Sequence, residues 1–270
     1  MSPRFPIFAL VALLLLSIPV FSLPWGAIDE IRYKTKSIDG NRWGNRLGNG
    51  FIVKGPESPG TVTFTFDDGP DHRTTPILLD QLDRYGIKAV FFVNGAKFHS
   101  RTAGGQENQA TLREIHRRGH YIGNHTFNHK NITQLDDRGW RTEVLQVEQV
   151  LTALTGQRPW LFRPPFGKMD NKSLERLGIN GYTVVMWNLD PLDWRAEGPE
   201  ELLERTQNVL NENPQGGVFL LHDTNQTTIE SFPLIVEWIL ERNESLRAQR
   251  KPGLKIVGIE QFITSKRPAF

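Results

Sequence analysis

The chain has 270 residues, of which 38% are hydrophobic and 23% charged, a composition typical of a globular protein with one large domain or two small ones. Its 32 basic and 30 acidic residues leave a formal net charge of +2, which gives no electrostatic argument for nucleic-acid binding. The absence of cysteine excludes thiol nucleophiles, disulfides and cysteine-ligated zinc, and is compatible with work outside the cytoplasm.

An apolar run opens the chain over residues 5–23, after Arg4, and small residues stand near its end around Ser22. A short positive region followed by an apolar stretch and a small-residue cleavage site is typical of a secretory signal peptide. The run also comes close to the ~20 residues that a membrane span requires. We therefore interpret residues 1–22 as a signal peptide or an uncleaved membrane anchor, and expect the protein to be exported.

Residues 23–60 contain Gly, Asn, Arg, Trp and Pro without sustained periodicity, so we interpret them as an N-terminal extension. From Thr61 onward, apolar strands alternate with amphipathic helices. The predicted strands cover residues 62–66, 89–93, 121–123, 160–162, 183–187, 218–221 and 255–259. The predicted helices lie near residues 74–85, 110–118, 138–155, 171–178, 199–211 and 228–243. This alternation predicts parallel βα units over residues 61–264, arranged as a barrel or as an open doubly wound sheet.

Polar clusters stand at the carboxyl ends of the predicted strands. They are Asp67-Asp68, the segment from His125 to His129, Arg163 with two following prolines, Asp193-Trp194, and His222. Functional sites occupy this edge both in α/β barrels and in open α/β sheets, so we expect these side chains to share one mouth. Residues 97–110, which include two adjacent glycines, are expected to form a loop near that mouth.

His125 and His129 are spaced i, i+4, so a helical turn would place both imidazoles on one face. Two imidazoles and one carboxylate form an open metal site with room for water, which suits Zn²⁺ and also non-haem Fe(II). Either metal would lower the pKa of a bound water. Hydrolysis then requires a base and an acid, for which the second aspartate of the adjacent pair and His222 are candidates.

Other side chains near the mouth have supporting roles in this interpretation. Arg163 stays charged and would hold a carboxylate in place, and the prolines after it stiffen the backbone. Phe166 and Trp194 are aromatic residues that either stack on sugar rings or pack in the core. The two aromatic residues are therefore tentative substrate-binding candidates.

Taken in order, these clusters resemble the five motifs of the polysaccharide deacetylase family, the NodB-like carbohydrate esterases. The motifs here are Thr65-Phe66-Asp67-Asp68-Gly69-Pro70, His125-Thr126-Phe127-Asn128-His129, Arg163-Pro164-Pro165-Phe166-Gly167, Asp193-Trp194 and Leu220-Leu221-His222. They span residues 61–223 and carry no substitution at the family's key positions. The resemblance implies a distorted (β/α)7 barrel, which agrees with the predicted strands.

The resemblance also implies a role for each key residue. The metal ligands would be Asp68, His125 and His129. Asp67 would be the catalytic base, oriented by Arg163. His222 would be the catalytic acid, paired with Asp193.

The implied activity is that of a metal-dependent hydrolase of carbon–nitrogen bonds other than peptide bonds. It would remove acetyl groups from an N-acetylglucosamine-containing polysaccharide, peptidoglycan or chitin-like, with Zn²⁺ as the expected metal and Co²⁺ or Fe²⁺ as alternatives. We expect a monomer whose partner is the glycan, with no nucleic acid and with membrane contact only through an uncleaved anchor. The expected location is extracytoplasmic: secreted, periplasmic or associated with the cell envelope.

Three other functions are considered. An O-acetyl esterase acting on xylan or another O-acetylated glycan would use the same water and the same oxyanion stabilisation. A non-haem Fe(II) oxygenase usually has its carboxylate shortly after the first histidine, whereas here Asp68 precedes His125 by 57 positions (68 to 125). A carbohydrate-binding envelope protein without turnover would not need an intact base, ligand set and acid.

Overall fold

The computed structural model describes the backbone of residues 52–53 and the whole of residues 60–262. The predicted signal or anchor at 1–22 and nearly all of the predicted extension at 23–60 lie outside the described residues. Among the helices of the described part, none combines the length and the apolar character that a bilayer crossing requires.

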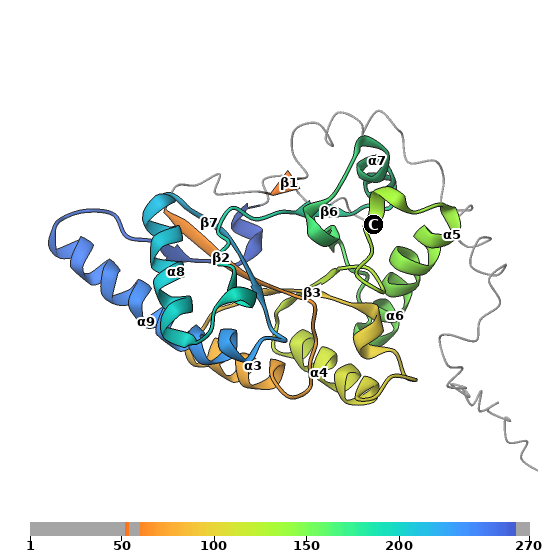
Figure 1. The fold of residues 1–270 in the computed structure, drawn as a ribbon, viewed down its shortest axis with the longest axis horizontal. Coiled ribbons are helices and arrows are strands. Elements are labelled where there is room, and N and C mark those ends of the chain that lie inside the picture. The colour runs from red at the N-terminus through yellow and green to blue at the C-terminus, as the bar shows by residue number, and fades with distance from the viewer. Residues whose placement is uncertain (1–51, 54–59, 263–270) are drawn as a thin grey trace, which may run out of the picture. The chain divides into compact units, whose positions relative to one another are not determined.

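All the paired strands run parallel, in the order β1-β6-β5-β4-β3-β2-β7, with β8 added to β2 (Figure 1). Their bounds are β1 Ile52–Val53, β2 Thr61–Asp67, β3 Val90–Val93, β4 Tyr121–Asn124, β5 Leu161–Phe162, β6 Thr183–Val185, β7 Gly216–His222 and β8 Lys255–Ile256. From β2 to β6 neighbours in space follow the chain order, and β7 returns to the free side of β2. A doubly wound sheet would reverse its order at a switch point, so this progression favours the barrel.

The segment that follows β6 joins this strand to β7. Leu189 forms a parallel bridge with Phe219 of β7. The Leu189 N–H donates to the carbonyl of Val218 at 3.1 Å, and the Leu220 N–H donates to the carbonyl of Leu189 at 2.9 Å. The strands therefore close into a ring whose joint between β6 and β7 is this short contact, to which Asn188 adds side-chain hydrogen bonds with Gly216 and Val218.

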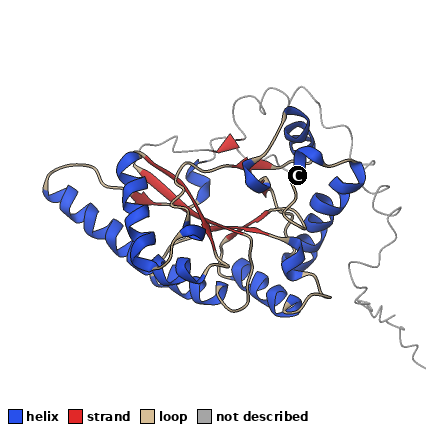
Figure 2. Cartoon of the chain, viewed as in Figure 1, coloured by secondary structure: helices blue, strands red, loops and turns tan. Residues whose placement is uncertain are grey.

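Helices lie outside the strands and occupy the intervals where the sequence predicts them (Figure 2). Their bounds are α3 Thr75–Arg84, α4 Gly105–Arg117, α5 Asp137–Trp140, α6 Gln146–Thr155, α7 Asn171–Ile179, α8 Pro199–Glu212 and α9 Gln226–Ala248. The single helix predicted at 138–155 consists of α5, a π-helical turn η4 (Arg141–Leu145) and α6.

Two expectations about local structure need correction. Of the loop expected at 97–110, only residues 99–104 lie outside regular elements, because its ends belong to a 3₁₀ turn, η2 (Gly95–Phe98), and to the first residues of α4. Gly104 has φ 73, so it supplies the left-handed turn after which the helix can begin. The sequence also predicts no strand before residue 61, but β1 pairs with β6 at Ile52 and Val53. A strand of two residues is too short to show the alternation on which strand prediction depends.

Both faces of the central strands are buried, as in other parallel sheets covered by helices. On the outer face of β2, Phe64 stacks on Phe219 of β7 with ring centroids 5.0 Å apart, and meets Phe232 of α9 edge-on at 5.1 Å. The opposite cluster gathers residues of β3, β5, β6 and β7 over the 3₁₀ turn η7 (Ile259–Phe262): Val90, Phe92, Leu161, Val185, Val218, Ile259 and Phe262. The core thus fixes the strands whose carboxyl ends carry the polar clusters.

Truncation of Phe64, in the aromatic cluster with Phe219 and Phe232, should strongly destabilise the fold. Phe64 is fully buried, so we expect Phe64→Ala to lower the free energy of unfolding by about 3–5 kcal/mol, because the cavity it leaves between β2 and α9 cannot collapse completely. Urea denaturation followed by circular dichroism measures this. Ile77→Ala on α3, at a side chain that is 47% exposed, is the control and should cost no more than about 0.5 kcal/mol. Equal costs for the two variants would contradict this packing.

Candidate active site

The adjacent aspartates diverge at the end of β2. Asp67 is buried, whereas the next residue, Asp68, turns into the left-handed region with φ 70 and is only partly covered. Asn94, which follows β3, donates from Nδ2 to Asp68 Oδ1 at 2.8 Å and from its backbone N–H to the Gly69 carbonyl at 2.8 Å. Neighbouring strands thus fix two carboxylates in different environments.

The two histidines of the second motif lie on a loop that follows β4. Thr126 and His129 have φ 67 and 55, so the segment is not the helical turn that the i, i+4 spacing suggested. The two left-handed residues nevertheless bring the imidazole centroids of His125 and His129 to 4.9 Å. The proximity expected from the spacing is therefore present, but a loop produces it.

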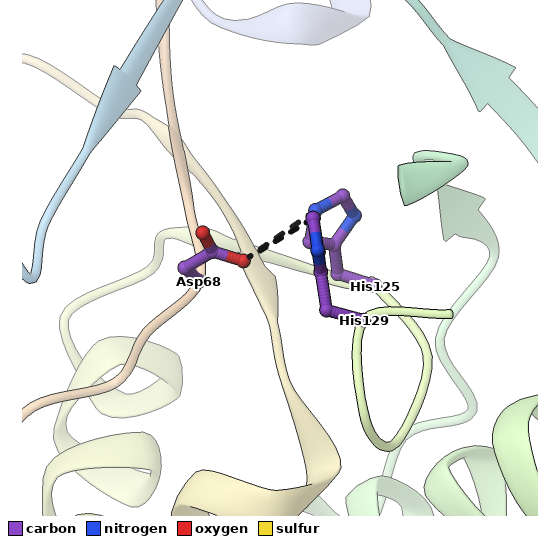
Figure 3. Close-up of side chains that lie close together, drawn as sticks. All are labelled: Asp68, His125 and His129. Atoms are coloured by element: carbon purple, nitrogen blue, oxygen red, sulfur yellow. Dashed lines mark ion pairs between the residues drawn. The ribbon is translucent and has the colours of Figure 1, made fainter. Parts of the chain in front are cut away.

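Asp68, His125 and His129 converge on one point (Figure 3). Asp68 Oδ1 lies 3.7 Å from the Nε2 atoms of both histidines, and one ligand atom of each residue falls within 4.8 Å of the others. The Nδ1–H of His125 donates to the Arg163 carbonyl at 2.7 Å, which leaves a lone pair on Nε2. Lone pairs facing a carboxylate repel one another unless a cation lies between them, so this donor set fits a divalent metal ion.

Arg163 is fully buried and holds Asp67 from inside the barrel. Its Nη1 donates to Asp67 Oδ1 and to Thr65 Oγ1, each at 2.7 Å, and its Nε donates to the Val185 carbonyl at 3.0 Å. The guanidinium carbon lies 4.3 Å from the centre of the Phe92 ring. Burial lowers the pKa of Arg163, while the charge and the hydrogen bond of Asp67 oppose that shift.

His222, the last residue of β7, forms the second ion pair of the site. Its Nδ1 lies 2.8 Å from Asp193 Oδ1, and its backbone N–H donates to Asp193 Oδ2 at 2.7 Å. Thr228 of α9 also donates to Asp193 Oδ2, at 2.6 Å. Burial disfavours the charged imidazole, but the hydrogen bond and charge of Asp193, together with the carboxylates that end β2, outweigh it and raise the pKa of His222 to about 9.

These groups line an open cleft of about 790 Å³. The cleft is bordered by Asp67, Asp68, His125, His129, Pro164, Phe166, Trp187, Asp190, Leu192, Trp194, Leu220, His222, Thr224 and Asn225. Phe166 and Trp194 are 61% and 56% exposed, so they belong to the rim and not to the core. Arg163 and Asp193 stand behind the cleft wall, where each holds a residue that faces it.

Left-handed backbone is concentrated at this cleft. Of the six described residues other than glycine with positive φ, four line it: Asp68, His129, Phe166 and Leu192. Each such conformation costs roughly 1–2 kcal/mol relative to the right-handed form. The surrounding contacts must therefore hold these residues, and strain of this kind tends to accumulate at functional sites.

Sequence reasoning did not identify several residues that support the site. Asn94 and Thr228 bind the key carboxylates, and the buried Glu143 of η4 binds the histidine loop. Asp223 is also buried; burial raises its pKa to about 7, and Thr75 donates to its Oδ2 at 2.6 Å. A Cβ at position 69 would overlap the Asp223 carboxylate, which explains the glycine of the first motif. An acidic residue in an apolar helix stripe was a readable signal for Glu143; the other partners are distant in sequence.

The sequence profile described as polysaccharide deacetylase matches residues 54–185. A peptidoglycan-N-acetylglucosamine deacetylase of Bacillus cereus is 32% identical over 177 residues, which cover 64% of this chain and 60% of that protein. A chitin deacetylase of Pestalotiopsis sp is 34% identical over 181 residues, which cover 67% of this chain and 59% of that protein. The chain thus spans about 60% of the length of these two relatives.

Among solved structures, that of the Bc1960 peptidoglycan N-acetylglucosamine deacetylase matches with a TM-score of 0.67 at 23% identity, covering 83% of this chain and 98% of that one. This likeness confirms the predicted distorted (β/α)7 barrel. The matched profile begins seven residues before the predicted domain start at 61 (54 against 61), and the domain limits remain predictions. With the ordered motifs at the strand ends, these matches show that the chain belongs to the polysaccharide deacetylase family.

Proposed function

We propose that the protein is a metal-dependent hydrolase that removes acetyl groups from a polysaccharide containing N-acetylglucosamine. The observation that carries this proposal is the meeting of an Asp–His–His donor set with two ion pairs at one open cleft. The names of the relatives, peptidoglycan and chitin deacetylases, support the substrate class. Because peptidoglycan lies outside the cytoplasm, we also infer that the protein acts there, as its apolar N-terminal run suggests.

Asp68, His125 and His129 would hold the metal ion. Nitrogen and oxygen donors without thiolate suit Zn²⁺, and Co²⁺ or Fe²⁺ fits the same set. A divalent cation at this position supplies Lewis acidity, which polarises a carbonyl oxygen and makes water a better proton donor. Asn94 steadies the carboxylate ligand through its bond to Asp68 Oδ1.

Asp67 is the proposed base. Arg163 binds its Oδ1, which leaves Oδ2 as the oxygen that can take a proton from the attacking water. Oδ2 lies 3.6 Å from His125 Nε2, so this oxygen points toward the ligand cluster. Arg163 thereby fixes the direction in which the base acts.

His222 is the proposed acid. With a pKa of about 9 the imidazole is charged at neutral pH, and Asp193 occupies its Nδ1, so Nε2 is the atom that donates a proton to the departing amine. Phe166 and Trp194 flank the mouth with exposed aromatic faces on which sugar rings can stack.

Metal removal should abolish activity. After treatment with a chelator, acetate release from peptidoglycan or from chitin oligomers should cease, and Zn²⁺ or Co²⁺ should restore it, because Asp68, His125 and His129 would bind the ion reversibly. Acetate is measured enzymatically. Full turnover in protein shown to be metal-free would contradict the mechanism, and faster release from acetylxylan than from either N-acetylated glycan would favour the O-acetyl esterase.

Substitution should distinguish the roles of Asp67 and Asp68. Asp67→Asn keeps the side-chain shape but removes the base, so kcat should fall by about 10²-fold or more while the metal content is unchanged. Asp68→Asn should instead reduce the metal content. Steady-state kinetics and metal analysis of both variants test this; loss of metal from Asp67→Asn alone would reverse the assignments.

The pH dependence should report on the acid. The raised pKa of His222 means that its charged form is complete at neutral pH and is lost as pH rises through about 9, which sets the alkaline limb of kcat/KM. Asp193→Asn removes the charge that raises this pKa, so the limb should move to lower pH, toward the ordinary histidine value of 6.5.

A matched control is Asp190→Asn, because this cleft carboxylate accepts from the Leu192 N–H and does not bind His222. Its alkaline limb should stay in place. An unmoved limb in Asp193→Asn, with metal and fold intact, would refute the assignment of the acid.

A further inference from the structure

Glu143 is a buried acid whose contacts are directed at the histidine loop. It lies on the π-helical turn η4 between α5 and α6 and is 1% exposed. Its Oε2 accepts from the backbone N–H of Asn128 at 2.7 Å, and its Oε1 accepts from Asn128 Nδ2 at 3.1 Å. The ammonium of Lys130 lies 3.5 Å from Oε1. One carboxylate therefore binds the residues on both sides of His129.

The first half of this loop is held by other contacts. The Gly95 N–H donates to the Thr126 carbonyl at 3.0 Å, and the Ala96 N–H donates to the Phe127 carbonyl at 2.8 Å. Beyond Phe127, the chain must adopt φ 55 at His129 while its ring stays near that of His125. A left-handed residue other than glycine persists only where its surroundings enforce it. Glu143 supplies such a restraint at the residue immediately before His129.

The cost of burying a carboxylate also supports a role for Glu143 in holding the histidine loop. A buried charge is unfavourable unless hydrogen bonds and an opposite charge offset it. The hydrogen bonds and the ion pair found for Glu143 all go to Asn128 and Lys130. π-Helical turns of the kind that carries this residue occur frequently at functional sites.

The geometry points to Glu143 as a positioning residue that holds His129 in the orientation needed to bind the metal ion. This inference rests on the proposed function for the identity of His129 as a ligand. Groups that orient metal ligands typically change metal affinity by about 10–100-fold when they are removed. The inference is therefore tested by metal binding, which requires no turnover.

Glu148 provides a matched control on the same helical stretch. It is also buried and also ion-paired, with Arg158 Nη2 at 3.1 Å, and it hydrogen-bonds Tyr182, but neither partner belongs to the histidine loop. Loss of either acid should lower the stability of the fold. Only loss of Glu143 should change the metal site.

The experiment compares Glu143→Ala, Glu143→Gln and Glu148→Gln in the full chain. Zn²⁺ affinity is measured by competition with a chromogenic chelator, the ligand field by the visible spectrum of the Co²⁺-loaded protein, and stability by the melting temperature of the metal-free protein. Glu143→Ala should weaken Zn²⁺ binding by about 10–100-fold and alter the Co²⁺ spectrum. Glu143→Gln keeps an acceptor oxygen for the Asn128 N–H and should recover part of the affinity.

Glu148→Gln should change neither Zn²⁺ affinity nor the Co²⁺ spectrum. Unchanged Zn²⁺ affinity in Glu143→Ala would overturn the inference, as would equal losses of Zn²⁺ affinity in the Glu143 and Glu148 variants. If Glu143→Ala does not fold, the Zn²⁺ affinity of Glu143→Gln is judged by the same criteria. If the protein releases acetate and its Zn²⁺ affinity does not depend on Glu143, only this inference is refuted. If Zn²⁺ affinity depends on Glu143 but the protein releases acetate from no glycan tested, only the proposed function is refuted.

Discussion

The buried pair of Arg163 and Asp67 is the interaction on which the site depends. The arginine side chain binds β2 through Asp67 and Thr65 and binds β6 through the Val185 carbonyl. Its backbone carbonyl receives the Nδ1–H of His125, so the same residue orients a metal ligand. The proposed base, one metal ligand and strands β2 and β6 are thus all held by a single cationic residue inside the barrel.

Such a cation needs all of its partners. A fully buried guanidinium is costly to desolvate, and breaking a buried pair by removing one member typically destabilises a protein by about 3–5 kcal/mol. Arg163 meets this cost with hydrogen bonds from Nε and Nη1 and with the face of Phe92. In the second pair, the Asp193 carboxylate binds His222 and also accepts a hydrogen bond from Thr228. One member of each ion pair, Asp67 and His222, therefore faces the cleft while its partner holds it from behind.

The sequence predicted every described strand except β1, the helices and the edge at which the polar clusters meet, because alternating and amphipathic patterns are local properties of the chain. It did not predict the ring closure at Leu189, since that bridge joins segments about 30 residues apart (189 to 219) and leaves no periodic signal. The spacing of His125 and His129 correctly predicted that their rings are close, but it predicted a helical turn where the structure has a loop. The left-handed φ values at Thr126 and His129 are imposed by tertiary contacts, which the spacing does not show. Glu143 carried a local signal, a charge in an apolar stripe, but its partner Asn128 is known only from the fold.

The closure at Leu189 has a consequence for local unfolding. Along β2 and β7 the paired register extends from Thr61 to Asp67, whereas the joint between β6 and β7 depends on the short contact of Leu189 with Val218 and Leu220. Opening energies follow the number of buried contacts and hydrogen bonds that must break, so this seam should open at less cost than the β2–β7 pairing. The segment that carries Asp193 leaves the barrel just after Leu189. Amide hydrogen exchange at Leu189 and Leu220 would therefore report fluctuations of the segment that leads to Asp193.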